Sequence, residues 1–560
     1  MSLALPFVVE KSTDGRNGSP NRRLRSLLPK PLQRACADSN FLEDYLYWLP
    51  IDEIGVPDYY PKLSRSMREL TVRNLIYEIG AGLFVHIYPD PTGERDVYVP
   101  IEPHTTVKLD DIVSEVENEL LDWTEEIGLA ETEEEKREAL VRALDAIVTT
   151  GAGVGKIVMT PRQLQALQYV ILRDKVGLSL LQPLLLDPYI EDISCSGMGP
   201  VFIEHKIFSS LQGAITFPET EDVDRFVIWL GEWIKKPVTI RNPIVDATLP
   251  DGSRINIVYG TDISKRGSNF TIRKFSETPA SIMEIIEWGT MDYMMAAYLS
   301  FVLEESMNMF VVGATASGKT TTLNAISTFI LPDKKIVSIE DTPELQVPHK
   351  NWIREVTRGG GRESKGSEVG MFDLLKAALR QRPDRIIVGE IRGEEGAIAF
   401  QAMQTGHGVM STFHAASVEK LIQRLTGDPI NIPKAYVDNL DVVLIQAAVR
   451  SPGGGGMVRR VLSINEIVGY DAFTQSFSFI EAFRWNSTRD TFDFPGNMNS
   501  YLLEEKIAFR RGIPPFKRKT IYTELRRRAK IFERLHKERK VRKFHDVFKI
   551  LAEAHRQGLL

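Results

Sequence analysis

Residues 313–320 read G-A-T-A-S-G-K-T and directly follow the apolar run 309–312. The glycines let backbone N–H groups turn toward a phosphate, Lys319 can reach the β- and γ-phosphates, and the Thr320 hydroxyl can ligate Mg²⁺ at a helix N-terminus that favours anions. A strand before the loop and helix-forming residues 321–326 after it are the context that this chemistry requires. The sequence therefore predicts a site for ATP and Mg²⁺, made by Gly313, Ala314, Thr315, Ala316, Ser317, Gly318, Lys319, Thr320 and Thr321.

A second glycine-rich stretch, residues 151–156, resembles such a loop but lacks two of its parts. Thr150 stands where the first glycine is needed, and Ile157 stands where the hydroxyl that binds Mg²⁺ should be. We interpret this stretch as a linker.

The elements around the phosphate loop predict how other polar side chains reach it. From about residue 301 the strands are short and wholly apolar and alternate with helical segments, which is typical of a parallel sheet covered on both faces. Ligands bind beyond the carboxyl ends of such strands, so polar residues that follow them should converge on one crevice. The polar residues at or beside strand ends are Glu340, Asp341, Glu344, Glu390, His407 and His414.

Glu390 is the residue that we expect to polarise the attacking water. It ends the buried run 386–388 downstream of the phosphate loop, where a carboxylate can act on water or on the Mg²⁺ shell. Asp384 precedes the same strand, so it lies at the wrong edge of the sheet and is interpreted as a turn residue after Pro383.

Two interpretations remain open for Glu340, Asp341 and Glu344. They could form a helix N-cap with first-turn acids beside Pro343. Their position at a strand end instead favours Mg²⁺ or water binding by at least one of them.

His407 and His414 lie on the two sides of one strand and have no third metal ligand nearby, so we do not expect a metal site there. The alternatives are two imidazoles that flank one crevice and sense the γ-phosphate, or buried histidines satisfied by backbone groups. We favour the first.

An arginine finger can neutralise the charge that develops during phosphoryl transfer. Arg392 is the one arginine that follows closely on a motif acid. Arg254, Arg266 and Arg273, in the strand-rich region upstream, are further candidates, with exposed strand cations as the alternative.

Length and charge set the wider frame. A chain of 560 residues requires several domains, and no apolar stretch approaches the roughly 20 residues needed to span a bilayer. The N-terminus lacks a signal-peptide pattern and the two cysteines cannot form a disulfide framework, so we expect a cytoplasmic protein.

Thirteen acidic residues fall between Asp110 and Glu138, and sixteen basic residues between Lys506 and Lys543. The basic segment could dock on an anionic membrane, an acidic partner or nucleic acid, or could be a solvated helix face.

Together the motifs resemble the type II/IV secretion ATPases, which power pilus assembly, secretion, conjugation and the archaeal flagellum. The resemblance is carried by the phosphate loop, I-E-D-T-P-E-L at 339–345, R-P-D-R-I-I-V-G-E-I-R-G at 382–393 and T-G-H-G-V-M-S-T-F-H-A at 405–415, in that order. Residues 249–256 and 268–275 are similar to the archaeal and tight-adherence branch, as are residues 189–197. The absence of a tetracysteine zinc motif agrees with that branch.

The resemblance implies an α/β protein with a RecA-like ATPase domain, a smaller α+β domain before it, and a homohexamer in which arginines of the smaller domain complete the nucleotide site. It implies ATP hydrolysis that drives a pilus, an archaellum or secretion through an integral membrane platform protein. The basic tail could touch an anionic membrane surface, and nucleic acid is not an expected partner. The expected parts are a disordered basic arm (1–35), an α/β extension with an acidic helical segment (36–158), a PAS-like α+β domain (159–285), the ATPase domain (286–495) and a basic helical tail (496–560).

Two other function classes stay open on the sequence alone. One is a nucleic-acid translocase or helicase, which also uses RecA-like rings and would be stimulated by DNA or RNA. The other is a nucleotide-dependent scaffold that does not hydrolyse ATP, which a turnover assay would reveal.

Overall fold

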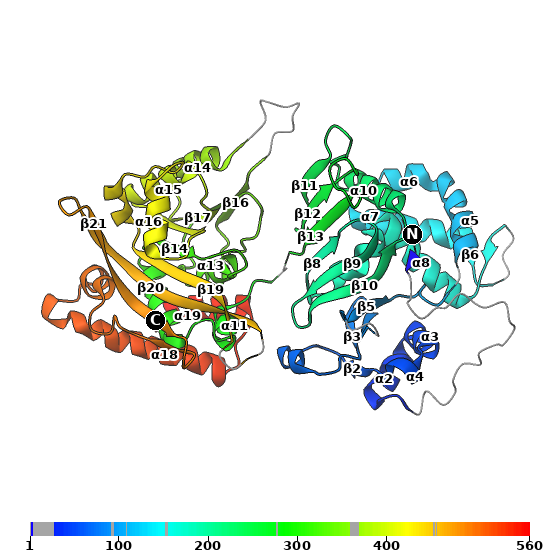
Figure 1. Ribbon diagram of the computed structural model, residues 1–560, viewed down its shortest axis with the longest axis horizontal. Coiled ribbons are helices and arrows are strands. Elements are labelled where there is room, and N and C mark those ends of the chain that lie inside the picture. The colour runs from blue at the N-terminus through cyan, green and yellow to red at the C-terminus, as the bar shows by residue number, and fades with distance from the viewer. Residues whose placement is uncertain are drawn as a thin grey trace. The chain divides into compact units, whose positions relative to one another are not determined.

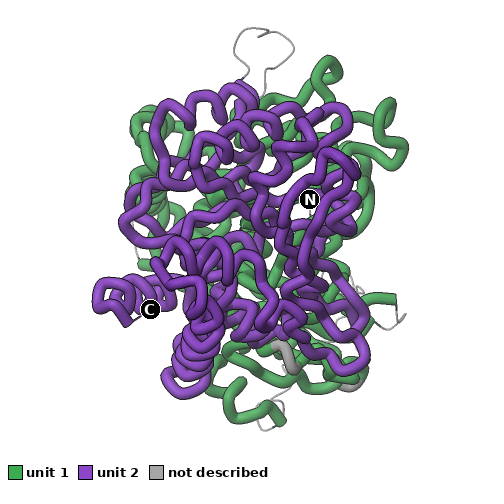
Figure 2. The backbone as a smooth tube through the Cα atoms, turned by 90° about the vertical axis from the view of Figure 1, so that its left-hand side faces the viewer, with its two compact units in different colours: residues 1–275 green, residues 276–560 purple. Residues whose placement is uncertain are grey.

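The computed structural model describes residues 2–3, 27–90, 94–107, 109–151, 155–275, 278–358, 369–451, 454 and 456–559. The chain divides into two compact units, residues 1–275 (unit 1) and residues 276–560 (unit 2), which Figure 2 colours separately. Each unit has its own large sheet and its own hydrophobic core. Most of the arm that the sequence predicts to be disordered lies outside the described residues, and helix α2 already begins at Lys30.

Unit 1 is built on a mixed sheet in which eleven strands are described (Figure 1). Their order is β11-β12-β13-β8-β9-β10-β5-β4-β3-β2, with β1 beside β10. Most neighbours are antiparallel, but β10 runs parallel to β5. The strands are β1 (Ser2–Leu3), β2 (Asp58–Tyr60), β3 (Leu75–Gly80), β4 (Leu83–Tyr88), β5 (Val97–Ile101), β8 (Ile190–Cys195), β9 (Gly199–His205), β10 (Ser209–Phe217), β11 (Ile244–Thr248), β12 (Arg254–Val258) and β13 (Asn269–Arg273).

This sheet does not stop at the predicted boundary between residues 158 and 159. Strands β2 to β5 come from the predicted extension and strands β8 to β13 from the predicted α+β domain, and the pairing of β5 with β10 joins them. Composition and linkers suggest where a chain changes character, but they do not reveal which strands pair across long separations.

The helices of unit 1 begin where the sequence supplies capping residues. Thr160 caps the helix that starts at Pro161 and exchanges hydrogen bonds with Gln163 in a capping box. Thr132 and Glu135 form the same capping box in the acidic segment, which is helical as expected. The helices are α2 (Lys30–Asp38), α3 (Asn40–Trp48), α4 (Ile51–Ile54), α5 (Asp110–Leu120), α6 (Thr124–Gly128), α7 (Glu133–Ile147), α8 (Pro161–Lys175), α9 (Gln182–Leu186) and α10 (Thr220–Trp233).

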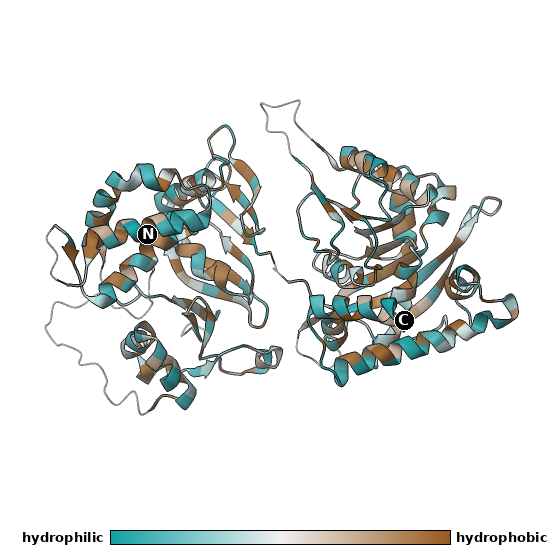
Figure 3. Ribbon diagram, turned by 180° about the vertical axis from the view of Figure 1, so that it is seen from behind, coloured by the Kyte–Doolittle hydropathy of each residue, from teal (hydrophilic) through white to brown (hydrophobic). Residues whose placement is uncertain are grey.

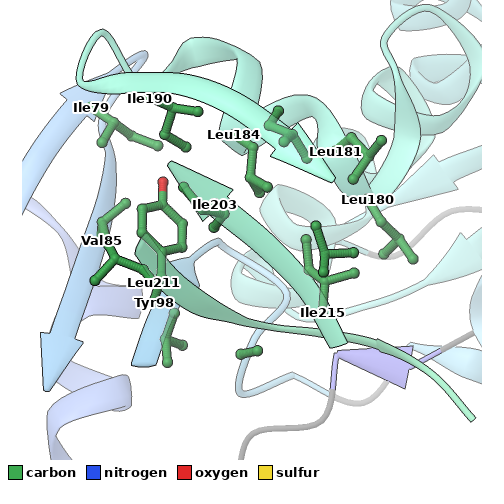
Figure 4. Close-up of a cluster of buried hydrophobic side chains, with 14 of the residues drawn as sticks. Ile79, Val85, Tyr98, Leu180, Leu181, Leu184, Ile190, Ile203, Leu211 and Ile215 are labelled. Carbon is green, nitrogen blue, oxygen red and sulfur yellow. The ribbon is translucent and has the colours of Figure 1, made fainter. Parts of the chain in front are cut away.

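The glycine stretch interpreted as a linker lies partly outside the described residues. Two short strands flank it, β6 (Val148–Thr149) and β7 (Ile157–Val158), and they pair in parallel. The core of unit 1 joins both predicted segments. Figure 4 shows part of it, with the labelled residues Ile79, Val85, Tyr98, Leu180, Leu181, Leu184, Ile190, Ile203, Leu211 and Ile215.

Unit 2 contains the predicted parallel sheet. Six neighbouring strands, in the order β16-β15-β17-β18-β14-β19, are parallel, and β20, β21 and β22 continue the sheet in antiparallel fashion (Figure 1). The strands nearest the phosphate loop are fully buried, as their apolar composition predicts. The strands are β14 (Met309–Val312), β15 (Ile336–Glu340), β16 (Trp352–Val356), β17 (Arg385–Glu390), β18 (Gly408–Phe413), β19 (Val442–Arg450), β20 (Met457–Asp471), β21 (Ser476–Asn486) and β22 (Thr491–Asp493).

The basic tail packs on unit 2 as part of its core. Helix α18 packs against α12. Figure 3 shows hydrophobic and hydrophilic residues alternating along α18. Arg528 pairs with Glu304 of α12, and Arg511 binds the same carboxylate with Nη2 2.9 Å from Oε2. The helices of unit 2 are α11 (Ile282–Glu287), α12 (Tyr293–Glu304), α13 (Lys319–Ser327), α14 (Met371–Arg380), α15 (Glu395–Gln404), α16 (Val418–Thr426), α17 (Ala508–Arg510), α18 (Ile521–Lys537) and α19 (Phe544–Arg556).

Candidate nucleotide site

The predicted phosphate loop connects β14 to α13, as its sequence context requires. Gly313 has no room for a side chain, because a Cβ atom there would lie 2.1 Å from the Gln446 carbonyl oxygen. Gly318 precedes α13 with a φ of 90°, in the left-handed region that favours glycine. The Ala314 carbonyl accepts hydrogen bonds from Ser317 Oγ (2.8 Å) and from Lys319 Nζ (3.0 Å). The loop is therefore folded back on itself, and the Lys319 side chain lies beside the Ala314 carbonyl.

Three predicted site residues meet beside this loop. His414 Nε2 lies 3.4 Å from Lys319 Nζ and 3.6 Å from Glu390 Oε1. Thr315 Oγ1 lies 3.4 Å from the same imidazole nitrogen. These residues follow or end the adjacent strands β14, β18 and β17, so the carboxyl ends of the parallel strands converge as expected.

The charges of this cluster are set by burial and by one another. Burial lowers the pKa of the Lys319 ammonium group, and the Glu390 carboxylate acts in the opposite direction. Burial also lowers the pKa of His414, and the positive charge of Lys319 adds to that effect. The imidazole is therefore neutral at neutral pH. Because an ammonium group can only donate, a hydrogen bond from Lys319 to His414 requires the tautomer that carries its proton on Nδ1.

Glu390 has one occupied and one available carboxylate oxygen. Its Oε2 accepts a hydrogen bond from Arg392 Nε at 2.8 Å. Its Oε1 is buried and has no hydrogen-bond partner among the described residues. A buried acceptor of this kind costs free energy unless a ligand or water satisfies it. Arg392, the arginine nearest the motifs, is thus engaged with Glu390 itself.

Glu340 lies at the end of β15, the strand next to β17. Like Glu390, it has one carboxylate oxygen that accepts hydrogen bonds and one that accepts none from the described residues. Oε1 accepts the backbone N–H groups of Glu344 (2.8 Å) and Leu345 (2.7 Å). Oε2 is buried without a hydrogen-bond partner in the part of the chain that is described, and Arg354 Nε lies 3.5 Å from it. Burial raises the pKa of this carboxyl to about 7. Gly389 makes room for the side chain, because a Cβ there would lie 3.2 Å from Glu340 Cγ.

The helix N-cap interpretation of this segment is wrong, because no helix begins between residues 340 and 345. Instead, the Glu340 side chain holds the following backbone. Asp341 is exposed and accepts a hydrogen bond from Thr357 Oγ1 at 3.2 Å. Glu344 contributes its backbone N–H to Glu340 and its carbonyl to Asn324.

His407 does not join the cluster, which corrects the expectation that both histidines flank one crevice. It precedes β18, whereas His414 follows it, and six strand residues span about 20 Å. Its Nδ1 lies 3.0 Å from Thr405 Oγ1. Asp384 lies at the same far edge, where it accepts the backbone N–H of Lys335 at 2.9 Å, as the turn interpretation predicts.

Arg254, Arg266 and Arg273 all belong to unit 1, whereas the phosphate loop belongs to unit 2. Their role as arginine fingers therefore stays a prediction. Arg273 pairs with Asp192, with 3.2 Å between Nε and Oδ1, and Arg254 lies 4.0 Å from Asp246. The backbone of Arg266 packs against Gly197.

Two residues near the loop were missed by the sequence reasoning. Gln446 is a buried polar residue in β19 that donates from Nε2 to the Ser317 carbonyl at 2.8 Å. Arg459 of β20 donates from Nε to the Ala316 carbonyl at 3.2 Å. An amide inside the apolar run 442–449 was a usable signal for Gln446, whereas nothing in the sequence marks Arg459.

Comparisons with known proteins agree with this site. The family model described as "Type II/IV secretion system protein" matches residues 179–452. A relative from Methanocaldococcus jannaschii, "Uncharacterized protein MJ0900", is 44% identical over 519 residues, which cover 90% of this chain and 93% of the relative. "Protein VirB11" of Rhizobium radiobacter is 29% identical over 268 residues, covering 42% of this chain and 77% of the relative.

Among solved structures, the pilus retraction motor PilT with bound ADP is 21% identical, with a TM-score of 0.36, and the match covers 51% of this chain and 80% of that chain. The family match includes the phosphate loop, both carboxylates and His414. The near full-length relative shows that the likeness extends through most of the chain. The chain therefore belongs to the type II/IV secretion system ATPase superfamily.

Proposed function

We propose that this chain hydrolyses ATP as one subunit of a hexameric motor at the inner face of a cell membrane. The motor drives assembly of a type IV-like pilus or an archaellum, or secretion, through an integral membrane platform protein. The observation that carries the proposal is the meeting of Lys319, Glu390 and His414 at the phosphate loop, with Glu390 Oε1 left without a hydrogen bond in the described residues.

The residues fit ATP and Mg²⁺. The loop conformation leaves no room for a side chain at Gly313 and requires a left-handed backbone at Gly318. The loop leads into the N-terminus of α13, whose backbone N–H groups can bind phosphate. Thr320 is half-buried in the first turn of that helix, where its hydroxyl would hold Mg²⁺, with Glu390 as a further group toward the ion. When bound, the ion neutralises charge on the phosphate oxygens.

The chain's own groups then divide the work of hydrolysis. Lys319 exchanges its hydrogen bond to the Ala314 carbonyl for the β- and γ-phosphates. Glu390 Oε1 accepts a hydrogen bond from the attacking water and orients it. The neutral His414, between the two, reports whether a γ-phosphate is present. Glu340 holds the backbone of residues 344–345 and offers Oε2 toward the same edge.

Arg254, Arg266 and Arg273 remain the proposed source of an arginine finger, supplied by the unit 1 of a neighbouring subunit. The exposure of Arg254 and Arg273, whose side chains are 50% and 64% accessible, supports a role at a subunit boundary.

The proposed membrane contact rests on the cations of the tail that unit 2 leaves exposed. Arg511 and Arg528 are used internally, whereas Lys519, Lys530 and Lys549 are exposed. No helix in the described ranges is both long and apolar enough to cross a bilayer. Contact through these exposed lysines would be electrostatic, and it would weaken as salt is added.

The decisive experiment is the substitution Glu390→Gln. The variant should bind ATP as the parent does but hydrolyse it at least about a hundredfold more slowly, because the amide cannot accept the water's proton. Lys319→Ala should lose nucleotide binding as well. Phosphate release and calorimetric titration measure the two quantities, and Glu390→Gln turnover at the parental rate would refute the chemistry. Stimulation by DNA or RNA, instead of by anionic vesicles, would favour the translocase alternative.

A further inference from the structure

The turn between α17 and the 3-10 helix η6 (Pro515–Thr520) exposes two aromatic side chains. Phe509 and Phe516 are 69% and 83% exposed, although they belong to a unit with a well-formed hydrophobic core. Helices α17 and η6 contact each other, so the two rings are carried by one compact segment. Single exposed apolar residues are common, but two phenyl rings on one short turn indicate a contact surface.

The backbone of this turn is held in place by unit 2. Gly512 has a φ of 67°, the left-handed conformation that ends many helices, and the Ile513 N–H donates to the Ala508 carbonyl at 2.9 Å. Ile513 also packs against the core, and Arg511 Nη2 lies 2.9 Å from Glu304 Oε2. Two prolines follow and restrict the backbone further. The two rings are therefore presented to solvent by a rigid support.

The same turn carries cations that the protein does not neutralise. Residues 506–519 contain six basic residues and no acidic residue. Three of the six form ion pairs within unit 2. The other three, Arg510, Lys517 and Lys519, are exposed and have no ion pair in the described parts of the chain. Because the whole chain has a net charge of -6, only such a local group of cations could draw it to an anionic surface, and it would orient the molecule there.

A third exposed phenylalanine of unit 2 lacks this setting. Phe473 is 97% exposed in the turn between β20 and β21, where its backbone N–H donates to Asp471 at 2.9 Å. Residues 470–476 contain no lysine or arginine. Exposed rings and unpaired cations therefore coincide in the α17–η6 turn but not in this hairpin.

We propose that the α17–η6 turn docks on an anionic lipid bilayer. Phe509 and Phe516 enter the boundary between headgroups and acyl chains, and the three unpaired cations lie beside lipid phosphates. This inference rests on the proposed function, which places the chain at a membrane, and it adds an apolar contact to the electrostatic one. Apolar rings beside cations fit such a surface, and a rigid turn loses little conformational entropy on docking.

The test is sedimentation of the full chain with vesicles that contain phosphatidylglycerol, at about 0.1 M and about 0.5 M salt. Phe509→Ser combined with Phe516→Ser should weaken binding about tenfold at both concentrations, because salt does not screen apolar burial. Lys517→Ala combined with Lys519→Ala should lose about tenfold at the lower concentration and much less at the higher one. Phe473→Ser is the matched control and should bind like the parent.

Insertion itself is measured with a tryptophan in place of each ring. In Phe516→Trp, brominated lipid should quench emission beyond the quenching of the seven native tryptophans in the parent. Phe473→Trp should show no additional quenching.

The inference is overturned if the double phenylalanine variant binds vesicles like the parent, or if Phe516→Trp shows no more quenching than Phe473→Trp. It is also overturned if the double variant changes self-association but not vesicle binding, because the turn would then contact a second copy of the chain. Turnover without vesicles should stay parental in all these variants. A parent chain without turnover would instead refute the proposed function.

Discussion

Asp187 of unit 1 and Glu340 of unit 2 are both buried carboxyls whose pKa burial raises, but the protein treats them differently. Both oxygens of Asp187 are satisfied: Oδ2 accepts the hydroxyls of Tyr77 (2.6 Å) and Tyr98 (2.9 Å), and Oδ1 accepts the N–H of Tyr189 (2.8 Å). Glu340 keeps one buried oxygen without a hydrogen bond in the described chain.

The difference distinguishes an acid whose two oxygens are both hydrogen-bonded within the protein from one that keeps an oxygen without a hydrogen bond in the described residues. The Asp187 network joins β3 and β5 to the turn before β8, so it fastens the two halves of unit 1. Glu340 and Glu390, on neighbouring strands, each leave an oxygen unsatisfied near the phosphate loop. Buried polar groups are normally paired, so these exceptions are the observation on which the proposed site depends, although Glu355 Oε2 on the adjacent strand β16 is also buried without a hydrogen bond from any described residue.

The largest expected effect comes from Glu340→Gln. Because the amide cannot carry the charge that Oε2 would offer to the site, turnover should fall about a hundredfold, no more than for Glu390→Gln, while ADP binding stays near the parental value. Phosphate release and calorimetric titration measure both. Glu355→Gln on the adjacent strand β16 is the control: Glu355 Oε1 accepts a hydrogen bond from Gln381 at 2.7 Å, and its Oε2 is likewise buried without one among the described residues. It tests whether an unsatisfied oxygen alone affects activity, and it should keep parental turnover. If Glu340→Gln turned over ATP as fast as Glu355→Gln, Glu340 would have no special role in turnover, and its contrast with Asp187 would have no functional meaning.

The second expectation concerns pH. In nucleotide-free and Mg²⁺-free protein, folded Glu340 keeps its proton up to a pKa of about 7, whereas the unfolded chain releases it near the ordinary value of 4.5. The folded state thus binds more protons in this window, and the free energy of unfolding falls as pH rises through it. Compared with Glu340→Gln, the parent should lose about 3 kcal/mol. Chemical denaturation at about pH 4 and about pH 8 measures the difference, and parallel pH profiles would contradict it.

Asp187→Ala should destabilise unit 1 by about 2 kcal/mol, because two tyrosine hydroxyls and one backbone N–H lose their acceptor. Asp187→Asn, which keeps an oxygen acceptor, should cost less. Chemical denaturation monitors the loss, and ADP affinity of unit 2 is the control readout. A variant that unfolds like the parent but binds ADP weakly would reverse the roles assigned to the two acids.

The smallest effects are expected at the far edge of the unit 2 sheet. Asp384→Ala removes a partly exposed acceptor and should cost about 1 kcal/mol or less, with turnover changed by less than about twofold. His407→Ala should likewise leave turnover near the parental rate. A large loss of activity in either variant would show that the two edges of the sheet are not functionally distinct.

Much of the site was predictable because its signals are local. Strand, loop and helix follow one another within residues 309–327, and the rule that ligands lie beyond strand ends placed Glu390 and His414 correctly beside Lys319. The same rule, applied strictly, excludes His407, and the sequence interpretation erred where it set that rule aside.

What the sequence could not supply depends on long-range pairing. The β5–β10 ladder joins residues more than a hundred positions apart, and Arg459 reaches Ala316 across a similar separation. No local pattern encodes such contacts. Likewise, the sequence does not show that basic residues of the tail form ion pairs within unit 2, because Arg528 pairs with Glu304 only when α18 packs on α12.

The parallel ladder between β5 and β10 has a mechanical consequence. Because Gln212 pairs with Val97 and Gly213 with Tyr98, strands β2 to β5 cannot move apart from strands β8 to β13 without breaking this ladder. The last strand of this sheet in chain order, β13, ends at Arg273, three residues before unit 2 begins, so the strand that leads into unit 2 belongs to the same hydrogen-bonded sheet as β2 to β5.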